Sequence, residues 1–170
     1  MCIRDRNKNI YQLTRENLKL TRETASELLE SIPPERIEKI ENERSFPHPD
    51  EVLTMAEKYK KPDLCNYYCA NQCPIGQEYV PEVKIKDLSQ IVLKMLASLN
   101  AMNKRKDRLI EITADGKISD DELEDFLYIQ EELERISITV ETLQLWAEKM
   151  LAAGVIDEAR YEAYRSRKKT

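Results

Sequence analysis

Three cysteines near the middle of the chain are the residues best suited to chemistry. Cys65, Cys69 and Cys73 follow one another at intervals of four residues, which places them on one face of any helix formed there. Thiolates on one face can bind zinc or an iron–sulfur cluster. An unbroken helix, however, separates Cys65 from Cys73 by about 12 Å, too far for one zinc ion held about 2.3 Å from each sulfur. The same thiols can pack as small apolar groups, and we expect packing without a metal.

The single histidine provides no catalytic arrangement. His48 lies between Pro47 and Pro49, and no serine, cysteine or lysine stands beside it in a recognisable nucleophile motif. It could add a nitrogen to the cysteine group, although no Cys-x-x-Cys pair anchors a metal there. The chain has only 3 glycines, far apart, so no Gly-rich loop can hold a nucleotide phosphate. We therefore expect no enzyme activity and no cofactor.

A second candidate for metal binding is the acidic turn at residues 115–122. Gly116 and Glu122 have the mutual spacing found in the latter half of an EF-hand calcium loop, but the first half lacks short Asp or Asn ligands. The same turn is explained without calcium. Gly116 can end one helix in the left-handed conformation, while Ser119 and Glu122 form a capping box for the next.

The composition favours an all-helical protein. Of 170 residues 35% are charged and 41% are hydrophobic, and the few glycines exclude a sandwich, barrel or Rossmann sheet. The net charge of -5 provides no overall basic field for nucleic acid, so any such binding has to be local. No apolar run is long enough to span a membrane, and the first thirty residues lack a signal sequence. We expect a cytoplasmic protein.

The chain divides into five predicted segments. Residues 1–6 resemble a translated sequencing adapter, and we give them, including Cys2, no functional weight. Residues 7–61 contain short apolar-periodic stretches broken at close intervals, which predicts a bundle of five small helices. The remaining segments are a cysteine- and proline-bearing linker at 62–83, a helical hairpin at 84–153 and a basic C-terminal tail at 154–170.

The predicted hairpin carries heptad repeats on both helices, roughly 84–112 and 119–151. In the second helix two apolar rows recur every seven residues: Phe126, Leu133, Val140 and Ala147, and Ile129, Ile136, Leu143 and Met150. The first helix has Leu88, Met95, Met102 and Leu109, helped by Val92 and Leu99. We expect these rows to pack together as a coiled coil. Four apolar residues lie off the rows and predict a homodimer through the C-terminal helices: Leu93, Leu96, Leu145 and Trp146.

Three short motifs lie within residues 7–61. Leu20-Thr21-Arg22-Glu23 begins one predicted helix, Ile37 and Ile40-Glu41-Asn42-Glu43 close the next, and Pro49, Leu53 and Ala56 mark the helix that follows. With these motifs the segment resembles the phage-repressor or Xre-type helix-turn-helix domain of bacterial transcription regulators. The expected core comprises Leu13, Leu18, Ala25, Leu28, Leu29, Ile37, Ile40, Leu53 and Ala56.

The resemblance implies a dimer that binds double-stranded DNA, with the helix over 34–42 in the major groove and the preceding helix against phosphate. On this interpretation Arg36 reaches a guanine edge and Arg22 contacts phosphate. The other predicted DNA-binding residues are Thr21, Glu35, Lys39 and Arg44. The alternative is an adaptor that has lost its DNA contacts and binds protein, because carboxylates beside Arg36 and Lys39 repel phosphate.

Overall fold

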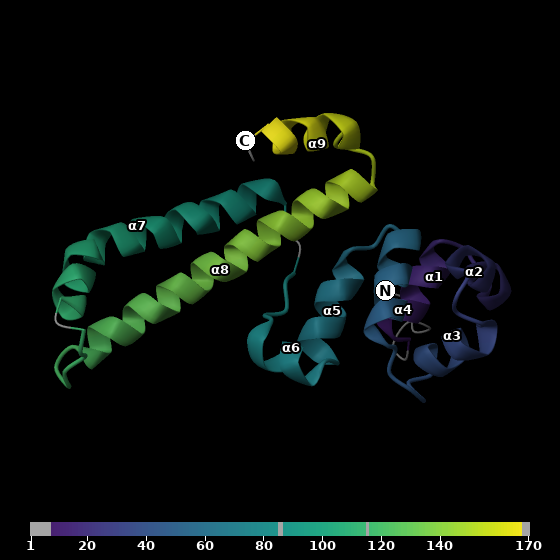
Figure 1. The fold of residues 1–170 in the computed structure, drawn as a ribbon, viewed down its shortest axis with the longest axis horizontal. Helices are drawn as coiled ribbons and strands as arrows, with labels where there is room; N and C mark the ends of the chain where they lie inside the picture. The colour runs from purple at the N-terminus through teal and green to yellow at the C-terminus, as the bar shows by residue number, and fades with distance from the viewer. Residues whose placement is uncertain (1–7, 85–86, 115, 168–170) are drawn as a thin grey trace. The chain divides into compact units, whose positions relative to one another are not determined.

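A computed structural model describes residues 8–84, 87–114 and 116–167. All secondary structure in this part is helical, which confirms the predicted all-α fold (Figure 1). The adapter-like residues 1–6 lie outside the described residues. Two compact units are present: Met1–Glu82 with Ala147–Thr170, and Val83–Trp146. No helix in the described ranges is long and apolar enough to cross a membrane.

The first unit begins with four short helices, each started by a clear signal. They are α1 (Ile10–Asn17), α2 (Arg22–Leu29), α3 (Pro34–Glu41) and α4 (Pro49–Lys58). The side chain of Asn9 accepts a hydrogen bond from the Gln12 N–H and so caps α1, and Thr21 caps α2 in the same way. The prolines at the starts of α3 and α4 need no hydrogen-bond partner for a backbone N–H.

Residues 62–83, predicted as a linker, instead contain two further helices of this unit, α5 (Asp63–Asn71) and α6 (Pro74–Tyr79). Leu64 is fully buried in the core of the bundle. The Tyr67 ring packs edge-on against Tyr11 of α1 at 6.2 Å, and the Tyr11 hydroxyl donates to Gln72 at 2.8 Å. Burial raises the pKa of Tyr11. The linker prediction was wrong because it did not consider that the cysteine and tyrosine side chains of this segment are partly apolar and can pack.

The observed core differs from the expected one in which large side chains it buries. Leu18, Leu28 and Leu53 are exposed, whereas Ala25, Leu29, Ile37, Ile40 and Ala56 are buried as expected. Leu13 is partly buried. The remaining core members are Tyr11, Ile32, Val52, Met55, Tyr59 and Leu64. Tyrosines reach the interior because a hydroxyl can find a polar partner while the ring is buried.

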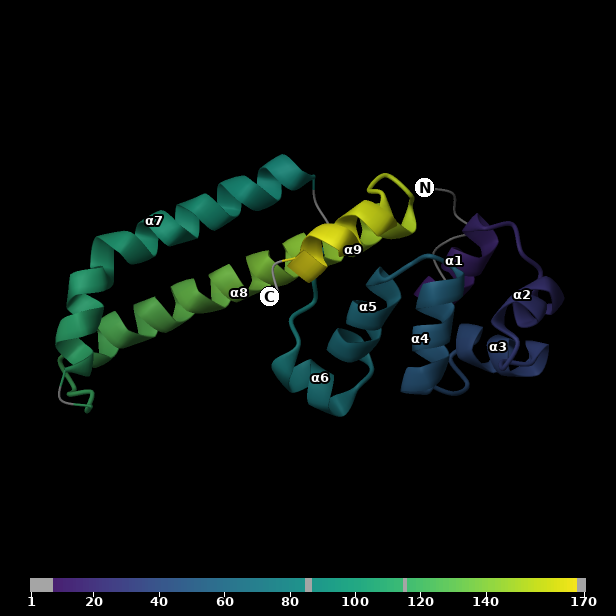
Figure 2. The same ribbon diagram turned by 45° about the horizontal axis from the view of Figure 1, so that its top comes forward.

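The second unit contains α7 (Leu88–Thr113) and most of α8 (Leu123–Ala152), which form a packed pair of long antiparallel helices (Figures 1 and 2). The turn between them is built as predicted: Gly116 has φ 72°, and the Glu122 carboxylate accepts from the Ser119 N–H at 3.0 Å. Asp125 accepts hydrogen bonds from both Arg105 and Arg108 of α7, at 2.9 and 2.7 Å, and so joins the two helices near the turn.

The contact seam of this hairpin keeps part of the predicted seam and differs from the rest by one residue in each helix. Ile129 is buried as expected, and the predicted residues Ile136, Leu143, Met95, Met102 and Leu109 are partly buried. The row Phe126, Leu133, Val140 and Ala147 was expected inside, but Leu133 is 51% exposed and Val140 40%. The neighbours Glu132 and Thr139 are buried instead. On α7, Ile91 and Ser98 are buried while Val92 and Leu99 are exposed. One residue turns a helix by about 100°, so these apolar residues face away from the seam instead of into it.

The predicted C-terminal tail contains a helix, α9 (Glu158–Arg167). The Asp157 carboxylate caps it by accepting from the Arg160 N–H at 2.7 Å. None of its residues is buried, which agrees with a solvated basic segment.

Gly76 allows α6 to lie against α5. A Cβ atom at this position would stand 2.1 Å from the carbonyl oxygen of Cys69, far inside van der Waals contact. We predict that Gly76→Ala forces the two helices apart and destabilises the first unit by about 2 kcal/mol, an overpacking cost. Thermal unfolding of the variant tests this, with the exposed Glu78→Ala as the control. Equal melting temperatures would contradict it.

Candidate nucleic-acid interface

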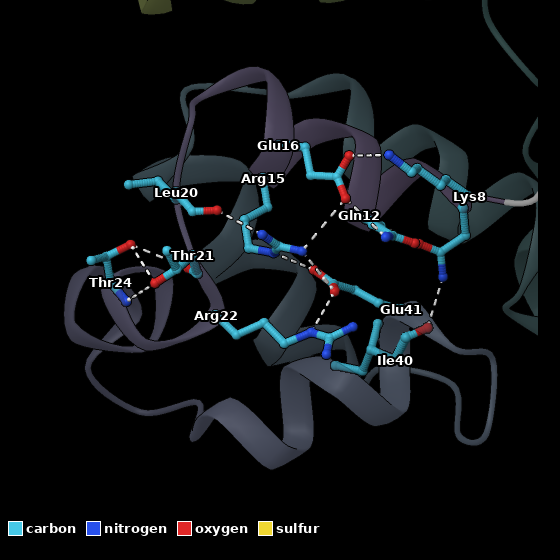
Figure 3. Close-up of polar contacts among 11 residues, drawn as sticks. Lys8, Gln12, Arg15, Glu16, Leu20, Thr21, Arg22, Thr24, Ile40 and Glu41 are labelled. Atoms are coloured by element: carbon cyan, nitrogen blue, oxygen red, sulfur yellow. Dashed lines mark hydrogen bonds and ion pairs between the residues drawn. The ribbon is translucent and has the colours of Figure 1, made fainter. Parts of the chain in front are cut away.

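A buried carboxylate joins three helices of the first unit. The Glu41 side chain, at the end of α3, is 1% exposed. Arg15 of α1 donates to both of its oxygens, from Nε at 2.6 Å and from Nη2 at 3.0 Å. Arg22 of α2 donates from Nε at 2.9 Å (Figure 3). Both oxygens of the carboxylate therefore accept hydrogen bonds from arginine, as a buried charge requires.

Further bonds fix the chain around this ion cluster. Arg15 donates from Nη1 to the Leu20 carbonyl at 2.6 Å, which ties α1 to the start of α2 (Figure 3). Asn9 donates to the Ile40 carbonyl at 2.7 Å. The hydrogen bond to Glu41 raises the pKa of Arg15, against the opposing effect of burial. The orientation of α3 is thus set by α1 and α2.

The turn between α2 and α3 is tight and strained. Glu30 has φ 59° and ψ -47°, and the Ser31 N–H donates to the Leu29 carbonyl across it. This is a γ-turn of the positive-φ kind, which is rare for residues other than glycine. The exposed Glu30 carboxylate pairs with Lys58 of α4 at 3.0 Å. The connection therefore holds α3 close to α2 without a glycine.

Arg36, predicted to contact a base, is occupied inside the protein. Its Nε and Nη2 donate to the two oxygens of Glu51, each at 2.7 Å. Its remaining bonds go to the Ser45 hydroxyl at 2.7 Å and the Phe46 carbonyl at 2.9 Å. Four of the five N–H donors of a guanidinium are thus used to join α3 to α4 and the loop between them.

The exposed face of α3 contains Glu35, Lys39 and Asn42, spaced four and three residues apart so that they share one side of the helix. No ion pair of Lys39 is formed with the described residues. Arg44, just beyond the helix, is largely exposed and only 3.8 Å from Glu38. Thr21 is exposed at the start of α2. The structure therefore brings Lys39 and Arg44 together near the end of α3 and separates Arg36 from them.

Sequence reasoning missed the residues that hold this face in place. Arg15 and Glu51 drew no attention, and Glu41 was noted only as part of a motif. No spacing rule pairs Arg15 with Glu41, because the two residues are 26 positions apart. Glu51 was recognisable only as an acid in the first turn of a helix, where it accepts from the His48 N–H at 2.6 Å.

The three cysteines are partly buried free thiols. Cys65 packs against the core, and burial raises the pKa of its thiol. The described part of the chain contains no group of three His, Cys, Asp or Glu residues that could hold a metal ion. Of the acidic turn, Asp115 lies outside the described residues, and Gly116 and Glu122 serve the turn and the cap.

Comparisons with known proteins identify no relative: no family model, curated protein or solved structure matches the chain. The interface is therefore assigned from its geometry. The candidate feature is the exposed face of α3, whose opposite side is held by charged groups of three other helices.

Replacing the shared carboxylate tests whether it fixes α3. In Glu41→Gln two arginines lose their buried counter-charge, so we predict a loss of about 3 kcal/mol in the free energy of unfolding. Urea denaturation followed by tyrosine fluorescence measures this, because Tyr11 and Tyr59 lie in the same core. Glu38→Gln, one turn earlier on α3 with a side chain that is 42% exposed, is the control and should change stability by less than about 0.5 kcal/mol. Equal losses in both variants would contradict a structural role for Glu41.

The pair of Arg36 and Glu51 predicts a pH dependence. Burial opposes ionisation of Glu51, but the hydrogen bonds from Arg36 and the His48 N–H outweigh it and lower the pKa of the carboxyl. A lowered pKa stabilises the fold above the ordinary value of about 4.3, and this stability is lost as the pH falls through the lowered pKa. Glu51→Gln should be less stable than wild type at pH 7, and the two should converge on acidification in denaturation experiments. A constant difference from pH 7 to pH 3 would contradict this.

Proposed function

We propose that this protein binds double-stranded DNA as a homodimer and regulates transcription. It would act in the compartment that holds the DNA. The observation that supports the proposal is the exposed face of α3, carried on a helix whose opposite side is fixed through Glu41. A recognition helix needs such support, because base contacts require positions held within a fraction of an ångström.

In the proposed complex α3 lies in the major groove and its exposed face meets base edges. Lys39 is suited to the acceptors of guanine, Asn42 to adenine and Glu35 to the amino group of cytosine. Arg44 and Thr21 are placed to contact phosphates on either side. Because only one Lys and one Arg near the end of α3 carry positive charge toward the DNA, nonspecific affinity should be low.

Of the three arginines expected to contact DNA, Arg36 and Arg22 take different parts in this proposal from those predicted. Arg36 positions α3 against α4 through Glu51 and does not reach a base. Arg22 holds Glu41 through Nε alone, and no bond of its terminal nitrogens is formed with the described residues. Those nitrogens can therefore donate hydrogen bonds to a phosphate as well.

One observation favours the second candidate, a protein-binding adaptor. Glu23, Glu27 and Glu30 are exposed and follow one another along α2 at helical spacing. In a repressor-like complex this helix lies against the DNA backbone, where three carboxylates are repelled. A basic surface of another protein would be attracted to the same stripe.

The homodimer is supported by the hairpin, which leaves many large apolar side chains exposed on α7 and α8. Monomers rarely keep such apolar stripes in water. A dimer carries two copies of α3, so its site should be a pseudo-palindrome with half-sites about 34 Å apart.

Binding to DNA fragments from the region upstream of the protein's own gene tests the proposal. Lys39→Ala should weaken specific binding by about 1–3 kcal/mol and relax the preference at one base position, because a guanine contact is lost. The exposed Lys60→Ala, which follows α4, is the matched control and should bind like wild type.

Arg44→Ala should instead lower the affinity for all fragments and reduce the slope of affinity against salt by about one. Equally weak binding of all variants to every fragment would favour the adaptor.

A further inference from the structure

The exposed apolar residues of the hairpin form two rows that stand next to its seam. On α7 the buried seam positions Ile91 and Ser98 are each followed by an exposed apolar residue, Val92 and Leu99. On α8 the buried Glu132 and Thr139 are followed by the exposed Leu133 and Val140 in the same manner. Leu88 and Leu96 extend the α7 row. We call these six exposed residues the apolar face.

Both rows lie on the same side of the hairpin. Each row is displaced from the seam by one residue, which is about 100° in the same rotational sense along its own helix. Because α7 and α8 run in opposite directions, equal rotations away from a shared seam point to one common side. The contacts of Arg105 with Asp125 and with the Tyr128 ring set the level of the pairing. At that level Leu99 is opposite Leu133, and Val92 is opposite Val140.

The hairpin alone does not account for this arrangement. It buries Glu132 and Thr139, which are polar, and leaves Leu133 and Val140 exposed beside them. A two-helix unit that needed only its own seam would do the reverse, since apolar area removed from water is the main stabilising contribution. A second layer of helices over the apolar face would bury both sets.

The charges of the two helices indicate what that layer is. The segment Leu88–Thr113 carries five Lys or Arg residues against two acids, whereas Leu123–Ala152 carries seven acids against two Lys or Arg residues. A two-fold interface places the same surface on both partners, so that surface has to complement itself. This hairpin does so, provided that α7 of one copy lies against α8 of the other.

We propose that the apolar face is covered by a second copy of the chain in an antiparallel four-helix bundle, with α7 of each copy against α8 of its partner. The two-fold axis then runs along the hairpins and both turns lie at one end. The other pairing, α8 against α8, would bring two strongly acidic helices together and is disfavoured by their repulsion. The inference rests on the dimer of the proposed function and specifies its surface and arrangement.

Sedimentation velocity of the full chain without DNA tests the surface. Wild type should sediment at about twice 19.9 kDa. Leu133→Glu should shift the dimer to monomer, because it places a carboxylate in the apolar face. Leu127→Glu is the matched control: it lies on the same helix, is 49% exposed against 51% for Leu133, and points to another side. Circular dichroism has to show equal helix content in the two variants. The proposal would be overturned if wild type were monomeric, in which case a different protein would cover the apolar face. It would also be overturned if the two variants behaved alike.

Salt tests the arrangement. If α7 lies against α8 of the partner, opposite charges attract, and the dissociation constant should rise severalfold between about 50 and 500 mM NaCl. If like helices pair, screening relieves repulsion and the constant should fall, which would overturn the pairing. These readouts are independent of DNA: a dimer with the expected behaviour that binds no DNA retains this inference and contradicts the proposed function.

Discussion

The carboxylate of Glu41 is shared by two arginines, and the relative placement of three helices depends on it. Each arginine comes from a different helix, so a shift of α1 or α2 would break part of the pairing of this buried charge. Such an arrangement contributes little net stability compared with an apolar core, but it strongly disfavours other packings. The strained turn at Glu30 and the pair of Arg36 with Glu51 act in the same direction. Together they hold α3 against α1, α2 and α4.

The second unit follows a different design. Its two helices are held in register by arginines around Asp125 at the turn end, and its seam mixes apolar with polar side chains. Ionic contacts specify orientation well and contribute modestly to stability when they are exposed. The hairpin is therefore well defined in geometry and weak in apolar burial. Such a hairpin gains further buried apolar area when another molecule covers the exposed apolar rows of α7 and α8.

Much of the fold could be predicted from the sequence, because helix starts and stops are local. Thr21, Pro34 and Pro49 marked the helices of the first unit to within about one residue. The faces of the long helices were harder, since a shift of one residue separates Leu133 from Glu132 and contacts such as those of Asp125 come from the other helix. The candidate site was predicted least well. The sequence identified Arg36 as a basic residue in the first turn of a predicted helix. Its partner Glu51 is 15 positions away, and their pairing is seen only in the fold.

The burial of Leu64 beneath the tyrosines of α5 has a consequence for how the first unit can be moved between proteins. The bundle does not end where its repressor-like motifs end, because α5 fills part of its interior and Gln72 receives the Tyr11 hydroxyl. A chimera joined at residue 61 would leave a wet cavity beside α4 and an unsatisfied tyrosine. The exchangeable module extends through α6 to residue 82, so a chimera that carries the first four helices has to carry the cysteine-bearing helices with them.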